Sequence, residues 1–352
     1  MLTAVSGLST AAIACIALAV LTSSQNVLIT WSKRNGGYEY NYVSVTMLTE
    51  LLKLSVSLYL LYREQRARRE QDTRDMERGV LADGADDDSS NEAAAAAANS
   101  GSAPSRLPKV DMAYELSYRG FSDRLPFALP AALYFLKNNL VFYGLLQSDP
   151  VQFQLLGNLK ILTTTLLFRL IMKKPLSDLA YVSLLLLTIG LTVTQLKSDT
   201  QLALTLDAVL TQTVIATLSA LAAIVTEWLM KSNPRRQLES LHIQNIWLYV
   251  YGILFNLLAL IGDDYEALWR DGFFYGYSWT TLFIICNNAW SGIAVSAIMK
   301  YANNLVKLFV FAVSLVITTV LSIAFFSFEP SLHFALGSTV VFVSIYLYNR
   351  KD

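Results

Sequence analysis

Long apolar segments alternate with short polar segments along most of the chain. A membrane-spanning helix needs about 20 mostly apolar residues, and ten segments meet this requirement. The predicted spans are 8–31, 41–62, 126–146, 150–172, 176–196, 203–229, 241–262, 277–299, 303–327 and 332–349. Some connections are very short, as between the third and fourth spans at Ser148-Asp149-Pro150. Neighbours joined this tightly must run antiparallel.

Ten spans divide into two halves of five. Because an odd number of crossings inverts the second half relative to the first, this count predicts two inverted five-helix repeats, an arrangement common in transporters. Similarities between the halves are weak, for example Asn138-Asn139 in span three and Asn287-Asn288 in span eight. The predicted organisation is therefore spans one and two in 1–62, spans three to five in 126–196, and the second repeat in 203–349.

The segment 63–125 differs from the rest of the chain. Six arginines lie between 63 and 78, and three aspartates (86–88), a six-alanine run (93–98) and a Ser/Gly-rich stretch follow. This composition has little apolar surface to bury, so it predicts a mostly disordered cytosolic loop. Residues 111–121 are predicted to form a short interfacial helix.

Composition and charge narrow the class of protein. The chain is 54% hydrophobic and 15% charged, with a mean hydropathy of +0.43. Soluble domains carry about 25% charge, so a soluble globular fold is excluded, and the zero net charge gives no basic surface for nucleic acid. If both termini are cytosolic, 19 of the 27 lysines and arginines face the cytosol and four face the opposite side, as the positive-inside rule requires.

The sequence offers no catalytic or metal-binding motif. Cys15 and Cys286 lie in apolar runs, and His242 and His333 are far apart, so neither a disulfide framework nor a metal site is predicted. A membrane enzyme acting on nucleotide-linked substrates remains an alternative, because acidic residues gather in 263–271. That cluster is typical of a solvated loop. No enzyme activity, cofactor or metal is therefore expected.

Six of the charged residues in the predicted spans qualify as functional candidates. A charge at the bilayer centre costs about 2.5–3.5 kcal/mol on insertion scales, so such residues are candidates for function. They are the lysines Lys53, Lys137, Lys160 and Lys307 and the acids Glu50 and Glu227. The excess of two positive charges predicts a cavity for an organic anion and speaks against a non-transporting scaffold. Aromatic faces beside cations suit a ligand that has a nucleobase and a phosphate. Three tyrosines lie in spans with lysines or near other polar residues: Tyr134, Tyr249 and Tyr301.

The positions of these charges separate functional from structural interpretations. Glu50 and Lys53 are spaced i,i+3, which puts both on one face of span two. Lys160 lies about ten residues into span four, roughly 15 Å deep. Substrate contact is the favoured role of Lys53 and Lys160, with an internal ion pair as the alternative. Glu227 and Lys231, spaced i,i+4 near a helix end, favour a surface ion pair.

Several motifs in order resemble the nucleotide-sugar transporters, above all the branch that carries CMP-sialic acid, UDP-galactose and UDP-N-acetylglucosamine. They span nearly all of the chain except 63–125. The motifs are Thr49-Glu50-Leu51-Leu52-Lys53-Leu54, Leu133-Tyr134-Phe135-Leu136-Lys137-Asn138-Asn139, Gly157-Asn158-Leu159-Lys160, Gln244-Asn245-Ile246 with Tyr249, Gly272-Phe273-Phe274-Tyr275-Gly276-Tyr277, Met299-Lys300-Tyr301 through Asn304 and Lys307, and Val343-Ser344-Ile345-Tyr346-Leu347-Tyr348.

The resemblance implies a drug/metabolite-transporter fold in the Golgi membrane. It also implies exchange of a nucleotide sugar for the returning nucleoside monophosphate, and it is compatible with a homodimer. Carried over by position, it places the nucleotide near Glu50, Lys53, Tyr134, Asn138, Lys160, Asn245, Tyr249, Ser296 and Lys307. A second group of candidates is Lys137, Phe153, Gln154 and Tyr301.

The chain also departs from the family pattern. Phe153 and Gly157 replace two tyrosines of the animal CMP-sialic acid and UDP-galactose transporters, and Asn303-Asn304 replaces an expected Asp-Asn. The Gly-Asn-Leu-Lys form looks more like plant and algal members of the CMP-sialic acid transporter-like group. Base and sugar preference therefore stay open, and another organic phosphate carried on the same fold is the main alternative.

Overall fold

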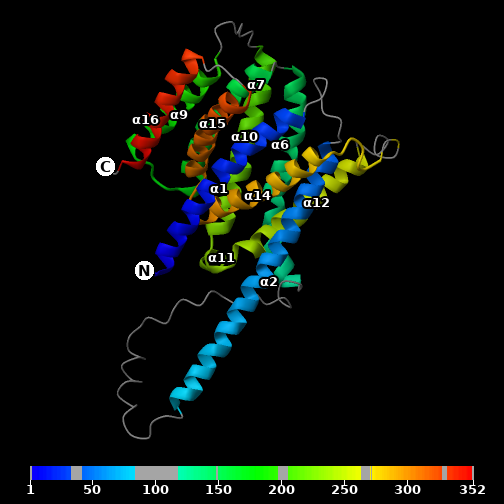
Figure 1. Cartoon of the computed structure of the whole chain (residues 1–352), viewed down its shortest axis with the longest axis vertical. Helices are drawn as coiled ribbons and strands as arrows, with labels where there is room; N and C mark the ends of the chain where they lie inside the picture. The colour runs from blue at the N-terminus through cyan, green and yellow to red at the C-terminus, as the bar shows by residue number, and fades with distance from the viewer. Residues whose placement is uncertain are drawn as a thin grey trace.

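The computed structural model describes residues 2–32, 42–83, 118–147, 150–196, 205–262, 270, 272–326 and 331–350. Within these ranges the chain is built from helices, without a strand (Figure 1). The helices are α1 (Leu2–Ser32), α2 (Tyr42–Asp83), α5 (Tyr118–Arg124), the 3₁₀ turn η1 (Leu125–Phe127), α6 (Ala128–Gln147), α7 (Pro150–Gly157), α8 (Leu159–Met172), α9 (Asp178–Gln195), α10 (Leu206–Lys231), α11 (Pro234–Leu238), α12 (Leu241–Gly262), α14 (Trp279–Tyr301), α15 (Asn304–Phe326) and α16 (Leu332–Asn349).

Seven stretches of these helices are long and apolar enough to cross a membrane. They are Ser44–Arg74, Leu155–Met172, Asp178–Gln195, Leu206–Lys231, Leu241–Ile261, Trp279–Tyr301 and Leu332–Asn349, and shorter apolar helices occupy Thr10–Ser24 and Asn304–Thr319. The protein is therefore an all-α, multi-pass membrane protein, as predicted. Ten spans in two inverted repeats remain a proposal.

The helices pack as a bundle of pairs. Helix α9 lies along α16, α1 packs on α14 and α15, α2 packs on α12 and α14, and α10 lies between α6 and α8. A core of Leu187, Ile224, Leu305 and their neighbours joins α8, α9, α10, α15 and α16. Because α10 contacts α6, α8, α14 and α15, it occupies the middle of the bundle (Figure 1).

Glycines allow the backbones of α9 and α16 to touch. A Cβ added at Gly337 would lie 2.6 Å from the Gly190 carbonyl oxygen and 2.6 Å from the Thr194 nitrogen. A Cβ at Gly190 would lie 3.0 Å from the Gly337 carbonyl oxygen. Small residues at such contacts are a common way to join helices in membranes, because they permit close van der Waals packing.

We expect Gly337→Ala to destabilise the protein, because its methyl group would meet backbone atoms that cannot move independently. Overpacking of this kind costs about 1–3 kcal/mol. The measurement is the Tm of the purified variant in detergent. Leu336→Ala is the control, since that side chain is 55% exposed on the outer face of the same helix. Equal Tm values for the two variants would contradict the close packing of α9 and α16.

The segment 63–125, predicted to be mostly disordered, begins as a helix, because residues 63–83 continue α2. Ion pairs spaced i,i+4 stabilise this extension: Arg66 with Glu70 at 2.9 Å, and Arg68 with Glu64. Arginine, glutamate and glutamine are also good helix formers. The low apolar content agrees with the mostly exposed side chains of 63–74, but it does not prevent helix formation. Residues 84–117 lie outside the described ranges.

Polar contacts hold together one end of the bundle, here called the α11 end after the helix labelled there in Figure 1. Helix α5 and the ends of α8, α10 and α14 also meet at this end. The Arg124 guanidinium donates to both carboxylate oxygens of Glu239, at 2.8 and 3.0 Å, and both side chains are buried. Lys300 donates to the backbone carbonyl of Glu239. Such a fork-on-carboxylate pair fixes orientation as well as distance, so the connection between α10 and α12 is held against α5 and α14.

Candidate functional site

Cavity A is a space of about 240 Å³ between α2, α6, α10, α12 and α14. Glu50 and Lys53 enter it from α2 as an ion pair, which confirms the prediction that they share one helix face. The Lys53 ammonium also lies 4.7 Å from the centre of the Tyr249 ring. Tyr134 and Ser296 complete the predicted residues of this cavity. A cation, a carboxylate and two phenol rings thus meet in one cavity.

Two glycines make room for the ion pair inside the bundle. A Cβ at Gly292 of α14 would lie 2.8 Å from the Lys53 Cδ atom. A Cβ at Gly252 of α12 would lie 3.4 Å from the Glu50 Oε2 atom. The first distance is a clash and the second is close to ordinary contact. The position of the Lys53 side-chain stem therefore depends on the absence of a side chain at Gly292.

Asn245 and Tyr249 lie one turn apart on α12. Asn245 is fully buried, and neither its amide nitrogen nor its amide oxygen has a hydrogen-bond partner among the described residues. Leaving a buried amide unpaired costs free energy. Such a group is therefore available to a ligand that presents both a donor and an acceptor.

Cavity B is larger, about 740 Å³, and lies between α6, α7, α8, α9, α10 and α15. Lys137, Phe153, Asn158 and Lys160 line it, and the charges of Lys137 and Lys160 repel each other across it. The Lys160 side chain is accessible because it faces this space, and its ammonium lies 5.7 Å from the centre of the Phe311 ring. Cavity B therefore has two lysines and no acidic residue in its lining.

The predicted fourth span is broken at this cavity. Helix α7 ends at Gly157, Asn158 forms a turn, and α8 begins at Leu159, directly before Lys160. Asn158 keeps helical dihedral angles, and its carbonyl accepts from the Ile161 N–H at 3.0 Å, so the interruption is a single tightened turn beside Lys160.

Lys307 lies deeper than the lysines of the two cavities. Its side chain is 8% exposed, and the charges of both Lys160 and Glu227 act on it. It forms no ion pair among the residues that the structure describes. Lys307 therefore adds positive potential behind cavity B rather than lining it.

The interpretation of Glu227 and Lys231 as a surface ion pair is wrong. The pair exists, with the Lys231 ammonium 2.8 Å from the carboxylate, but Glu227 is completely buried. Its second oxygen accepts from the backbone N–H and the side-chain amide of Asn304, at 2.8 and 2.9 Å. Lys231 also donates to the carbonyl of Ala302. The pair is thus an internal link between α10 and the start of α15, which sequence spacing alone could not show.

Not every predicted residue joins these cavities. Tyr301 lines a separate pocket at the α11 end. The side chains of Asn138 and Gln154 lie outside the described part of the structure, as does the acidic segment 263–269, so their roles stay predictions. Gln195 and Gln212 in cavity B and Asn256 in cavity A were not predicted. A polar amide within an apolar helix was the available signal for all three.

The fold and these cavities define a class: a helical membrane transporter with a cation-rich interior. The sequence from 109 to 349 matches the family model for nucleotide-sugar transporters. The chain is 38% identical to CMP-sialic acid transporter 2 of Oryza sativa subsp. indica, over 96% of this chain and 83% of that protein. It is also 38% identical to CMP-sialic acid transporter 4 of Arabidopsis thaliana, over 95% of this chain and 83% of that protein.

The chain therefore belongs to the nucleotide-sugar transporter family and is a transporter rather than an enzyme. A solved structure titled only "Crystal structure of protein" shares the fold, with a TM-score of 0.58 at 12% identity, over 97% of this chain and 96% of that chain. The resemblance inferred from the motifs is thus confirmed at the level of the family.

Proposed function

We propose that this protein is an antiporter that exchanges a pyrimidine nucleotide sugar for the corresponding nucleoside monophosphate. CMP-sialic acid or a UDP-sugar such as UDP-galactose is the proposed substrate. The observation that carries the proposal is the uncompensated positive charge of the interior. Glu50 pairs with Lys53 and Glu227 pairs with Lys231, so Lys160 and Lys307 lack an ion pair within the described part of the chain. A phosphate-bearing ligand would supply the missing negative charge.

The two cavities suit different parts of such a ligand. Cavity A offers Tyr134 and Tyr249, with the buried amide of Asn245 one turn away, which suits a base through stacking and paired hydrogen bonds. Cavity B offers the ammonium of Lys160, which suits phosphate. The CMP-sialic acid transporters named above support a pyrimidine. Phe153 and Gly157 lie in cavity B, where they would contact the phosphate or sugar.

Alternating access is the proposed mechanism. Cavity B reaches the last residue of α9, Gln195, and the second turn of α10 at Gln212, both toward the end of the bundle opposite α11. The α11 end is closed by Arg124 with Glu239 and by Lys231 with Ala302. Opening toward the α11 end requires these contacts to break. The asymmetry of lysines and arginines supports a cytosolic α11 end and cytosolic termini, and the family supports the Golgi membrane.

Gly292→Ala is expected to weaken nucleotide binding more than Gly252→Ala does. The methyl group at 292 would displace the stem of Lys53, whereas the methyl group at 252 meets Glu50 at close to ordinary contact distance. The measurement is the CMP- or UMP-dependent rise in Tm of each variant, and a loss of roughly tenfold in affinity corresponds to about 1.4 kcal/mol. Equal affinities for the two variants would argue against a role of the Lys53 position in binding.

A ligand panel tests the proposed substrate class. CMP, UMP, GMP, AMP, CMP-sialic acid, UDP-galactose and simple sugar phosphates are compared for their effect on the Tm of the purified protein, since a ligand that binds the folded state raises its stability. We expect the pyrimidine nucleotides and their sugars to stabilise the protein most. Equal stabilisation by all nucleotides and by sugar phosphates would instead favour a general organic-phosphate transporter on this fold.

A further inference from the structure

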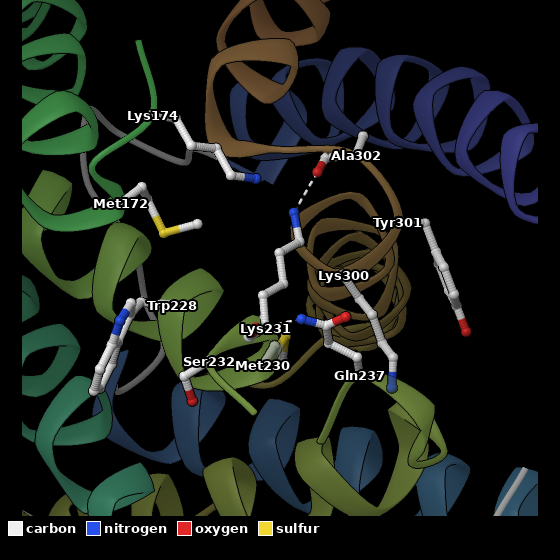
Figure 2. Close-up of a pocket in the computed structure, with 10 residues that line it drawn as sticks. All are labelled: Met172, Lys174, Trp228, Met230, Lys231, Ser232, Gln237, Lys300, Tyr301 and Ala302. Carbon is white, nitrogen blue, oxygen red and sulfur yellow. Dashed lines mark hydrogen bonds between the residues drawn. The ribbon is translucent and has the colours of Figure 1, made fainter. Parts of the chain in front are cut away.

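A third pocket lies at the α11 end, outside cavities A and B. It is called the lysine pocket here and is defined by Lys174, Lys231, Lys300, Trp228, Ser232 and Tyr301, together with four residues drawn with them in Figure 2. Its volume is about 610 Å³, within the range of small-molecule sites. None of its lining residues is acidic, although three are lysines.

The three lysines of the pocket differ in the polar partners that their ammonium groups have. Lys174 follows the end of α8 and forms no hydrogen bond or ion pair with the described residues. Lys231 binds Glu227 and the carbonyl of Ala302. Figure 2 shows the ammonium groups of Lys174 and Lys231 directed into the same part of the pocket, beside Ala302, and their charges repel each other. Two cations that face the same space raise the affinity for an anion bound between them.

The acidic groups near the pocket are already engaged. Glu227 lies beneath Lys231 and also binds Asn304. Glu239 pairs with Arg124 through its carboxylate and offers Lys300 only its backbone carbonyl. Glu64 acts on Lys300 at a distance, while it binds Arg68 and Ser240. Glu227 thus pairs with Lys231, and Glu239 and Glu64 act on Lys300 from a distance, whereas Lys174 has no paired acid among the described residues, so the pocket keeps an excess of positive charge.

We propose that the lysine pocket binds a phosphate-bearing polyanion, at a site distinct from cavities A and B. The ligand chemistry is a phosphomonoester or pyrophosphate group, carried either by the head group of an anionic lipid or by a free phosphate compound. The position at the ends of three spanning helices, with Trp228 and Tyr301 each more than 40% exposed, fits the level of lipid head groups. Basic pockets between helix ends bind phosphorylated head groups in other membrane proteins.

The test compares two adjacent lysines. Lys174→Gln removes the unengaged cation of the pocket, and Lys173→Gln removes an equal charge one residue away that does not line it. Inorganic pyrophosphate is titrated into the purified, delipidated full chain by calorimetry. In a second arm, each protein is placed in nanodiscs of phosphatidylcholine with or without phosphatidylinositol 4-phosphate, and Tm is measured.

We expect Lys174→Gln to weaken pyrophosphate binding by roughly tenfold, the effect of losing one charge-assisted hydrogen bond, or to abolish the stabilisation by the phosphoinositide. The affinity of Lys173→Gln should stay within about twofold of that of the unchanged protein. An effect on pyrophosphate alone identifies a free phosphate compound as the ligand, and an effect on the lipid identifies a head group.

Lys300→Gln repeats the test from the opposite side of the pocket. If Lys174→Gln and Lys173→Gln behave alike in both arms, the proposal is overturned. Because neither variant alters cavities A and B, this outcome is independent of the proposed transport activity.

Discussion

Lys231→Met is expected to lower the Tm of the protein strongly. The change leaves Glu227 without its cation in a completely buried position. Removing one member of a buried ion pair costs about 3–5 kcal/mol, because the remaining charge is neither paired nor solvated. Methionine keeps most of the volume of the lysine stem, so packing changes little. The measurement is the Tm of the purified variant without ligand.

The double variant Glu227→Gln/Lys231→Met is the matched control. Glutamine removes the stranded charge but keeps an oxygen that accepts from Asn304. We expect the double variant to recover most of the lost stability. A single variant as stable as the unchanged protein, or a double variant no better than the single one, would contradict the structural role assigned to this pair.

Lys160→Ala is expected to weaken nucleotide binding by roughly 10- to 100-fold. Lys160 faces cavity B, follows the start of α8 and lacks an ion pair among the described residues. A charge-assisted hydrogen bond contributes about 1.5–3 kcal/mol, and each 1.4 kcal/mol is a factor of ten. The measurement is the CMP- or UMP-dependent rise in Tm, compared with the ligand-free Tm of the same variant.

Lys173→Ala provides the control for Lys160→Ala, because it removes the same charge at the far end of α8. It should keep its nucleotide affinity. Lys53→Ala is less informative, since it also leaves Glu50 unpaired. The assignment of Lys160 to the phosphate fails if Lys160→Ala binds nucleotide as well as the Lys173 variant does.

Much of the helical framework could be predicted from apolar length alone. The segments 303–327 and 332–349 correspond closely to α15 (Asn304–Phe326) and α16 (Leu332–Asn349). In a membrane the backbone must satisfy its own hydrogen bonds, so an apolar run of sufficient length has little alternative to a helix. The extension of α2 to Asp83 was missed because it depends on ion pairs rather than on hydropathy.

The candidate site was predictable where local spacing determines the geometry. Glu50 and Lys53 share a helix face at i,i+3, and the structure pairs them. The depth of Glu227 was not predictable, because it depends on α15 covering that face of α10 with Asn304. Likewise, Gln212 and Phe311 reach cavity B only because distant helices pack together. Tertiary packing decides which polar residue faces a cavity, and a single sequence does not encode it locally.

The most direct test of the central claim is counterflow in proteoliposomes. Vesicles containing the purified protein are loaded with unlabelled CMP or UMP, or left empty, and uptake of labelled CMP and UMP is followed. A transporter whose cavity contains unpaired lysines should switch between its two open states far more readily with an anion bound. The ligand offsets the free-energy cost of moving unpaired charge through the low-dielectric core. The account predicts rapid uptake into loaded vesicles and little uptake into empty ones; equal uptake in both would contradict it.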